Sequence, residues 1–326
     1  MYENQYHDID LSNLQFLVTG GAGFIGANLV EYLLKYGAKK VRVLDNLSNG
    51  YLKNIEEFLN HPCFEFIEGD IRDFTTCEKA VEGMDYVSHQ AALGSVPRSI
   101  NDPITTNAVN ITGFLNMLCA VKDSKTVKRF VYAASSSTYG DSQELPKVED
   151  RIGKPLSPSA VTKYVNELYA DVFAKTYGIK TIGLRYFNVF GPKQSPDGAY
   201  AAVIPLFIQA VKNNQPATIN GDGEQTRDFT FIENVVQANI KALFVQKQEA
   251  INQIYNVACG ERISLNKLWK AINELAHKSI DFFYKEDRIG DVRNSLASIE
   301  KASNYLDYLP YFDLKSGLEK LMNISK

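Results

Sequence analysis

A strand that runs directly into closely spaced glycines and then into a helix constrains this chain more than any other feature. The strand covers 15–19, and the loop that follows it reads GGAGFIG at 20–26. Gly20 permits a tight turn, Gly23 lets the backbone approach a phosphate, and Gly26 lets the helix pack closely. The first N–H groups of the helix have no partner within it, so they attract an anion. The pattern therefore predicts the phosphate-binding start of a dinucleotide-binding domain.

Acidic residues at the ends of the next two expected strands complete this site. Asp45 ends the second strand, 19 residues after Gly26. At that place a carboxylate accepts hydrogen bonds from both hydroxyls of an adenosine ribose and repels a 2′-phosphate, so we expect NAD rather than NADP. Asp70 and Ile71 follow the third strand. We expect them to frame the adenine, and a simple turn is the alternative.

Composition excludes several classes of function. The 326 residues are 45% hydrophobic and 22% charged, which suffices for one large or two ordinary domains. The formal net charge of −3 gives no support for a nucleic-acid or anionic-membrane partner and favours a small-molecule partner. The four cysteines form no CxxC pair and the four histidines have no zinc-ligand spacing, so we expect a reducing cytoplasm and no metal site. We find no apolar run of the roughly 18 residues that a membrane span needs.

Short apolar runs alternate with helical periodicity through the first half of the chain. We expect an α/β fold in which residues 1–190 form a Rossmann doubly wound parallel sheet with helices on both faces. Residues 191–326 show isolated helices and short strands, and we expect mainly a smaller C-terminal α/β lobe that binds substrate across a cleft. The expected strands lie near 16–18, 41–44, 64–67, 86–89, 129–134, 180–186, 217–220 and 254–257, and the expected helices near 24–34, 103–121, 158–177, 201–212 and 265–277.

Several spaced motifs in order carry a resemblance to a known family. They are TGGAGFIG at 19–26, GDIRD at 69–73, HQAA at 89–92, a serine run at 135–137, Lys163 and RYFNVFGP at 185–192. The chain resembles an extended short-chain dehydrogenase/reductase, and more narrowly the UDP-hexose 4-epimerases. The stretches AALGSVPRS at 91–99 and GAYAAVIP at 198–205 resemble the branch that acts on UDP-N-acetylglucosamine or its uronic acid.

The resemblance implies a resident NAD and a 4-keto sugar intermediate. In the family, a tyrosine phenolate removes the proton of the sugar 4-hydroxyl while hydride passes to NAD and later returns to the other face of the sugar. The resemblance places Ser135 as the hydrogen-bond partner of the reacting oxygen. It places Lys163 on the nicotinamide ribose, where its charge lowers the pKa of the tyrosine.

Ser159 stands where the family has its catalytic tyrosine, four residues before Lys163. An aliphatic hydroxyl is a much weaker acid than a phenol, whose pKa is about 10, and it is too short to span the same distance. Tyr164 points away from that face of the helix. Two interpretations remain: a substitution introduced to trap substrate, which the intact surrounding motif favours, or a family member whose base is lost or rerouted. Either predicts binding with very slow turnover.

By resemblance, the cofactor residues extend around the glycine loop and the ends of the strands. Asn110 anchors backbone near the nicotinamide, and Phe187 packs near it. The full expected set is Gly20, Gly23, Phe24, Ile25, Gly26, Asp45, Asn46, Ser48, Asn49, Gly50, Asp70, Ile71, Gln90, Ala91, Ala92, Asn110, Lys163 and Phe187.

The resemblance also implies a UDP-sugar site with local cations for the two phosphates. Ser295 holds the position that gates the sugar pocket, and because serine is small we expect an N-acetylhexosamine to fit. Arg98 is placed to reach a 6-carboxylate if the sugar is a uronic acid. The expected contacts are Arg227 and Arg288 for the pyrophosphate, Asn188 for phosphate, Val203 and Asn220 for uracil and ribose, Asp291 for ribose, and Gly94, Ser95, Arg98, Ser135, Ser136, Ser137, Gln194 and Ser295 for the sugar.

We therefore predict a 4-epimerase of UDP-N-acetylhexosamines or their uronic acids, impaired by Ser159. A sugar 4,6-dehydratase is the first alternative, but Ser136 and Ser137 stand where a dehydratase carries its acidic pair. Another NAD-dependent sugar-nucleotide oxidoreductase would need to exchange its cofactor. A catalytically dead UDP-sugar-binding protein gains support from Ser159. Helices at 103–121 and 158–177 resemble those with which relatives form homodimers.

Overall fold

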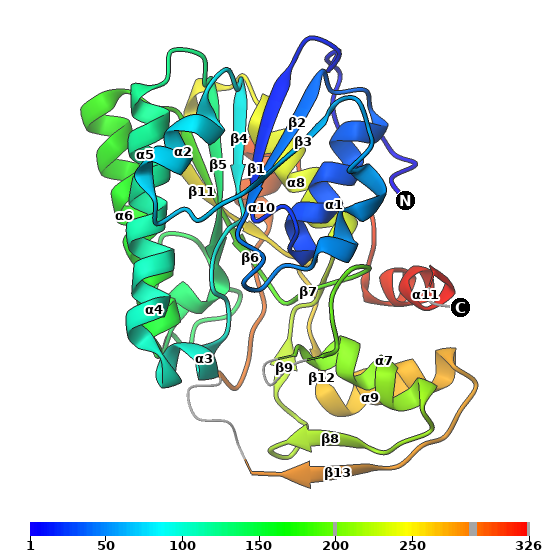
Figure 1. Ribbon diagram of the computed structural model, residues 1–326. Coiled ribbons are helices and arrows are strands. Elements are labelled where there is room, and N and C mark those ends of the chain that lie inside the picture. Colours follow the sequence, from blue (N-terminus) through cyan, green and yellow to red (C-terminus); the bar gives the residue numbers. More distant parts are fainter. Residues whose placement is uncertain (198–200, 287–291, 325–326) are drawn as a thin grey trace.

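Seven parallel strands form the centre of the protein (Figure 1). The computed structural model describes residues 1–197, 201–286 and 292–324. The strands are β1 Gln15–Thr19, β2 Lys40–Asp45, β3 Phe64–Glu68, β4 Tyr86–His89, β5 Arg129–Ser135, β6 Thr181–Tyr186 and β11 Gln253–Val257. Their order across the sheet is β11-β6-β5-β4-β1-β2-β3, so the strand order reverses at β1 and β4. Ligands bind outside the carboxyl ends of parallel strands at such a switch point.

Helices cover both faces of the sheet, as a doubly wound fold requires. In Figure 1, α1 and α8 lie on one side and α2, α5 and α6 on the other. The expected fold class, a Rossmann doubly wound α/β fold, is confirmed. The helices around this sheet are α1 Phe24–Lys35, α2 Phe74–Val81, α3 Val96–Asn101, α4 Pro103–Asn107, a π-helix Ala108–Gly113, α5 Phe114–Asp123, α6 Pro158–Tyr177, α8 Ile232–Phe244 and α10 Glu300–Leu306, with 3₁₀ turns Leu52–Asn54, Glu56–Phe58, Ser136–Tyr139 and Gln248–Ala250.

Local sequence signals explain why α6 begins and ends where it does. The hydroxyl of Ser157 accepts a hydrogen bond from the N–H of Ala160, 3.2 Å away, and Pro158 occupies the first turn, where no N–H is needed. Gly178 ends the helix in the left-handed conformation, with φ of 71°. This helix matches the range predicted from the sequence, and it carries two of the expected catalytic residues.

A smaller set of elements lies below the sheet in Figure 1. They are β7 Val189–Phe190, α7 Val203–Lys212, β8 Ala217–Asn220, β9 Thr226–Arg227, β10 Thr230–Phe231, β12 Ile263–Ser264, α9 Leu265–Leu275, β13 Phe282–Lys285 and α11 Leu314–Ile324. The helices expected at 201–212 and 265–277 are therefore shorter than predicted. β8 pairs with β13 in parallel, and β9 pairs with β12 antiparallel.

The strand expected near 254–257 is present, but we were wrong to place it in the smaller lobe. β11 pairs with β6 along its whole length, with Gln253 opposite Ile182 and Val257 opposite Tyr186. α8, which also follows residue 190, packs on the central sheet. Both elements are apolar, and an apolar run carries no information about which sheet it joins. The polypeptide thus leaves the large domain after β6, returns to it with α8 and β11, and returns a second time with α10.

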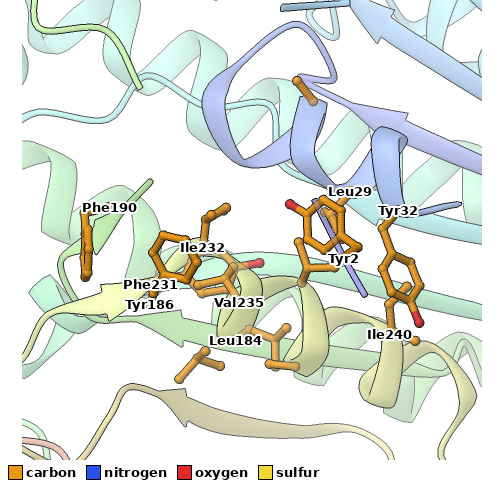
Figure 2. Packing of buried hydrophobic residues seen from close by; sticks show 14 of the residues in the cluster. Tyr2, Leu29, Tyr32, Leu184, Tyr186, Phe190, Phe231, Ile232, Val235 and Ile240 are labelled. Atoms are coloured by element: carbon orange, nitrogen blue, oxygen red, sulfur yellow. The ribbon is translucent and has the colours of Figure 1, made fainter. Parts of the chain in front are cut away.

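The main hydrophobic core lies between the sheet and the helices α1 and α8 (Figure 2). Leu184 and Tyr186 of β6 lie near Val235 of α8, and Ile240 of α8 lies beside Tyr32 of α1; these side chains are at most 9% exposed. A second cluster fills the opposite face of the sheet beneath α2, α5 and α6. Both faces are thus buried, as a parallel sheet demands.

The continuous helical run from Pro103 to Asp123 has the length and composition of a membrane span. The sequence reading recognised no apolar run of that length. In the structure, 44% of its most apolar window is buried inside the protein, and α5 packs against α2 and α6. A core helix of a soluble protein meets the same criterion, so this helix gives only weak support for a membrane.

An ion pair between Arg185 and Glu167 fixes α6 against the sheet. Arg185 of β6 donates to both carboxylate oxygens of Glu167 over distances of 2.8 Å, and each side chain is 3% exposed. Arg185 also donates to the carbonyl of Glu149. Because Glu167 lies one turn after Lys163, this pair fixes how closely the face of α6 that carries Lys163 packs against the sheet.

We expect Glu167→Ala to lower the free energy of unfolding by about 3–5 kcal/mol, because it leaves the Arg185 guanidinium buried without its partner. Asp171→Ala is the matched control, since Asp171 lies one turn further along α6 and pairs with Lys175 in solvent. That change should cost no more than about 1 kcal/mol. Denaturant unfolding of the two variants measures the difference, and equal losses would contradict the role given to the buried pair.

Candidate active site

The glycine loop between β1 and α1 is built so that backbone can approach backbone. A Cβ atom at Gly26 would lie 2.2 Å from the carbonyl oxygen of Gly20, and one at Gly20 would lie 2.7 Å from the backbone nitrogen of Ala91. Gly20 also has a φ of 67°. Gly23 precedes α1 without a side chain to cap it, so the first N–H groups of the helix remain available to an anion.

A cavity of about 480 Å³ lies above this loop. All the expected cofactor residues line it except Asn110, Lys163 and Phe187. It runs from the adenine end at Asp70, past the glycine loop, to Ala91 and Ala92 after β4. The segments that carry these residues all leave the carboxyl ends of parallel strands, which is why residues so far apart in sequence meet here.

Asp45 joins β2 to the glycine loop. Its Oδ2 accepts the N–H of Ala22 over 2.9 Å, and its Oδ1 accepts the N–H of Leu47 over 2.8 Å. Burial raises the pKa of this carboxyl, and the two N–H donors oppose that rise. Each oxygen retains a second lone pair, so the carboxylate can accept the two ribose hydroxyls that an NAD site requires.

Asp70 is fixed at one end of the cavity, where we expect the adenine. Arg72 donates to both of its carboxylate oxygens, and Asn46 donates to Oδ2 over 2.8 Å. The hydrogen bonds from the Arg72 side chain lower the pKa of Asp70 to about 2. A rigid, ionised acceptor therefore lies beside Ile71, in the arrangement that the sequence predicted for an adenine pocket. The same residues also form the predicted turn.

Asn110 anchors the backbone at the opposite end of the cavity. Its side chain accepts the N–H of Leu93 over 2.8 Å and donates to the carbonyl of Leu93 over 3.1 Å. It also donates to Thr162 of α6 over 3.0 Å. Asn110 lies within the π-helix Ala108–Gly113, and such insertions are frequent at functional sites. Asn110 therefore anchors the backbone of Leu93, its side chain does not line the cavity, and its place near a nicotinamide stays a prediction.

Lys163 lies behind this end of the cavity, on the face of α6 that packs against β5. Its Nζ donates to the carbonyl of Ala133 over 2.7 Å, and the residue is 8% exposed. Burial lowers the pKa of Lys163 to about 8, which the charge of Glu167 partly opposes. At the end of β5, the hydroxyls of Ser135 and Ser137 lie 2.8 Å apart.

Ser159 is buried one turn before Lys163, as the motif spacing predicts. Two other tyrosines of the Rossmann domain do not supply the missing phenol. The hydroxyl of Tyr139 donates to Asn256 over 2.6 Å, and that of Tyr186 is hydrogen-bonded to Gln90 and Asn239. Burial raises the pKa of each to about 12. Both hydroxyls are engaged elsewhere and are weaker acids than a free phenol.

Four of the expected substrate residues line one further cavity. These are Asn188, Val203, Asn220 and Arg227, and the cavity shares Ala201 and Ala202 with the dinucleotide cavity. Arg227 follows β8 within the smaller lobe, and its Nη1 donates to the carbonyl of Thr226. The two cavities are therefore neighbours, one at the glycine loop and one in the smaller lobe.

The expected sugar residues divide between two places. Gly94, Arg98 and Gln194 line the dinucleotide cavity, where Arg98 donates to Asn49 over 3.0 Å. Ser95 instead caps α3 with a φ of 123°, and Ser295 is buried with its N–H donating to Thr226. Phe187 is fully buried against Tyr139, Ala258 and Ala297, so it reaches neither cavity. Arg288 and Asp291 lie outside the described residues.

Sequence reasoning missed several residues that line the dinucleotide cavity. Asn54, Lys193 and Ser195 come from segments that no cofactor motif marks. Lys193 follows Gly191-Pro192 with a φ of 69°, which is unusual for lysine. Its place directly after the RYFNVFGP motif was the one available signal. The other missed residues are Leu44, Tyr51, Gly69, Leu93, Val109, Asp197, Ala201 and Ala202.

Residues 16–258 match the family model described as the NAD dependent epimerase/dehydratase family. The chain belongs to this family. NAD is therefore its cofactor, and the glycine cradle, the engaged Asp45 carboxylate and the shape of the cavity fit that molecule. The resemblance to extended short-chain dehydrogenase/reductases is confirmed.

Relatives in this epimerase/dehydratase family cover nearly the whole chain. The UDP-N-acetylglucosamine 4-epimerase from Methanobrevibacter ruminantium M1, in complex with UDP-N-acetylmuramic acid, is 36% identical with a TM-score of 0.90, covering 96% of this chain and 99% of that chain. The putative UDP-glucose 4-epimerase of Methanocaldococcus jannaschii is 36% identical over 95% of this chain and 98% of its own length. A tyrosine-to-phenylalanine mutant of UDP-glucuronic acid 4-epimerase from Bacillus cereus, in complex with NAD and UDP-4-deoxy-4-fluoro-glucuronic acid, is 34% identical with a TM-score of 0.88, covering 95% and 98%.

We expect Gly26→Ala to abolish the retention of NAD, because the added methyl would meet the carbonyl of Gly20. Gly94→Ala is the matched control from the same cavity, since a Cβ there meets no atom within 4 Å. The NAD released by denaturing each purified protein measures the effect. Retention by both variants, or loss from both, would contradict the close approach described here.

The depressed pKa of Lys163 predicts a pH dependence of stability. In the unfolded chain its pKa is about 10.4, and in the folded protein it is about 8. Between these values the unfolded state binds more protons, so the contribution of Lys163 to the free energy of unfolding increases as pH rises from about 8 to about 10. Thermal unfolding of the original protein and of Lys163→Met across this range should diverge accordingly. Parallel pH profiles would refute the buried charge.

Proposed function

We propose that this chain has the binding site of a UDP-N-acetylhexosamine 4-epimerase and catalyses the 4-epimerisation very slowly. The observation that supports this proposal is that the dinucleotide cavity and a second cavity, lined by Arg227, share Ala201 and Ala202, while Ser159 stands at the position of the family's phenol. NAD, when bound, supplies a reversible acceptor for the hydride of a sugar carbon. The protein must supply the binding, orientation and proton transfer.

Ser135 and Lys163 are the groups that we assign to the reacting end. Ser135 ends β5, where its hydroxyl can donate to a sugar oxygen once Ser137 is the donor and Ser135 the acceptor of the bond between them. Lys163 is held by the carbonyl of Ala133 and carries a pKa near 8, so it is mostly protonated at neutral pH. A buried cation at this place favours a negative charge on a neighbouring oxygen. These groups stabilise an oxyanion, but neither removes the proton efficiently.

An N-acetylated sugar is the substrate that we favour. Ser295 is small and buried, and by the resemblance it holds the position that gates the sugar pocket, where a small residue admits an acetamido group. A UDP-N-acetylglucosamine 4-epimerase is among the most similar structures, and it was solved with an N-acetylated UDP-sugar. A uronic acid remains the alternative, because Arg98 is a cation that lines the cavity and a relative is named a UDP-glucuronate 4-epimerase.

The expectation that both ligands bind without the phenol has support from a relative. The Bacillus cereus mutant in which phenylalanine replaces a tyrosine was solved with both NAD and a UDP-sugar analogue. We infer that the loss of the phenol from this chain likewise leaves both binding sites intact. The dehydratase alternative is disfavoured, because Ser136 and Ser137 carry no carboxyl group for the elimination of water. A catalytically dead UDP-sugar-binding protein would share all the binding residues.

We also propose that the protein is a homodimer through α4 and α6. Val161, Leu168 and Val172 form a stripe along α6 and are between 47% and 53% exposed. Ile104 of α4 is 81% exposed nearby, since α4 packs against α6. An exposed apolar face of this size on two adjacent helices favours burial against a second copy.

We expect Ser159→Tyr to raise the turnover number by about 10²- to 10⁴-fold, because it supplies a positioned general base. Ser159→Phe is the matched control, since it fills the same volume without the hydroxyl and should stay slow. Product analysis should start from UDP-N-acetylglucosamine, UDP-N-acetylgalactosamine and their uronic acids in separate reactions. The proposal fails if Ser159→Tyr interconverts none of them, or if the original protein turns over as fast as this variant.

A further inference from the structure

Lys193 connects the two walls of the dinucleotide cavity. It lies in the loop after β7, and its Nζ donates to the carbonyl of Asn54 over 3.0 Å and to Glu57 over 2.8 Å. Glu31 of α1 lies 3.4 Å away, and the ring of Phe58 lies beneath the ammonium. Both Lys193 and Asn54 line the cavity. The side chains of Lys193 and Glu31 are 16% and 21% exposed, so their contact is less screened than a surface ion pair, whereas Glu57 is 61% exposed.

The partner of Lys193 is itself bound to the glycine loop. The side chain of Asn54 donates to the carbonyl of Ala22 over 2.9 Å, and the N–H of Tyr51 donates to the same oxygen. The N–H of Ala22 donates to Asp45. A continuous set of hydrogen bonds therefore runs from the ribose-binding carboxylate, through the pyrophosphate loop, to Lys193 on the far wall.

A second set of buried bonds holds the same loop from behind. The side chain of Asn28, on α1, donates to the carbonyl of Pro192 over 3.0 Å and to that of Phe24 over 2.8 Å. Its Oδ1 accepts the hydroxyl of Tyr2 over 2.6 Å, and both side chains are fully buried. Figure 2 shows Tyr2 beside α1. Pro192 is thus fixed, and Lys193 projects from a fixed point.

The backbone of Lys193 is strained in a way that these contacts must offset. Its φ of 69° lies in the left-handed region, which lysine rarely adopts because its Cβ crowds the backbone. Such strain persists where the surroundings over-determine the conformation, and it concentrates at functional sites. The left-handed turn directs the ammonium across the cavity wall to Asn54 rather than out to solvent.

We propose that Lys193 is a positioning residue that slows the release of NAD by holding the loop after β7 against the segment after β2. This inference rests on the NAD binding in the proposed function and goes beyond it, because it names what retains the cofactor between turnovers. Release of the dinucleotide requires the two walls to separate, and separation exposes the ammonium and Glu57 unpaired. The charge-assisted bond therefore contributes to the barrier for release.

The test follows the loss of NAD during dialysis of purified protein against buffer without NAD, with the remaining NAD assayed after denaturation. We expect Lys193→Met to release NAD about tenfold faster, which corresponds to the loss of one charge-assisted hydrogen bond. Lys193→Arg should restore slow release, because its guanidinium donates to the same oxygens. Lys175→Met is the control, since Lys175 forms an exposed ion pair on α6, away from the cavity.

Four outcomes decide the inference. Faster release from Lys193→Met, with UDP-sugar affinity unchanged in calorimetry and rescue by Lys193→Arg, supports it. Equal release rates for the original protein and Lys193→Met overturn it, while NAD retention in both leaves the proposed function intact. Absence of NAD from the original protein overturns both. If Lys193→Met fails to fold, Glu31→Gln combined with Glu57→Gln removes the two carboxylates that pair with Lys193 and must also speed release, or the inference fails.

Discussion

The carbonyl oxygen of Gly20 lies where any side chain at position 26 would have to be, and the rest of the site depends on that approach. It brings the start of α1 against the end of β1, so the unpaired N–H groups of the helix face the switch point of the sheet. The adjoining loop then serves as the common attachment for both walls. The carboxylate of Asp45 accepts the N–H of Ala22 in this loop, and the side chain of Asn54 donates to the carbonyl of the same residue. A larger residue at this contact would displace all of these bonds together.

Binding and proton transfer are located on different elements of this protein. The dinucleotide cavity is formed by loops after β1, β2, β3 and β4, whereas the reacting groups lie on β5 and α6. A change at Ser159 therefore removes the phenol without disturbing the glycine loop or Asp45. The buried Lys163 remains, with its pKa near 8, and it retains the charge that would have acted on a phenol. On the proposed function, this separation lets the protein keep its ligands while it loses most of its rate.

The sequence predicted the features that have local causes. The range of α6 follows from the Ser157-Pro158 start and the Gly178 end, and the glycine loop is set by contacts within a few residues. The positions of β11 and α8 were not predictable in this way, because an apolar run is equally suited to either sheet. The tie formed by Lys193 was missed for a similar reason. One lysine in a loop carries no pattern, and its partners at Asn54 and Glu57 come from more than 130 positions away.

The account holds that this chain binds NAD and a UDP-sugar but removes only very slowly the hydroxyl proton that must leave as the hydride passes to NAD. The most direct test adds UDP-N-acetylglucosamine to the purified, NAD-containing protein and records the near-ultraviolet absorbance of reduced nicotinamide, with sugar binding followed in parallel by calorimetry. We predict saturable binding of the UDP-sugar with no reduced nicotinamide. Reduction of the bound cofactor upon sugar binding, at the rate seen with Ser159→Tyr, would contradict the account.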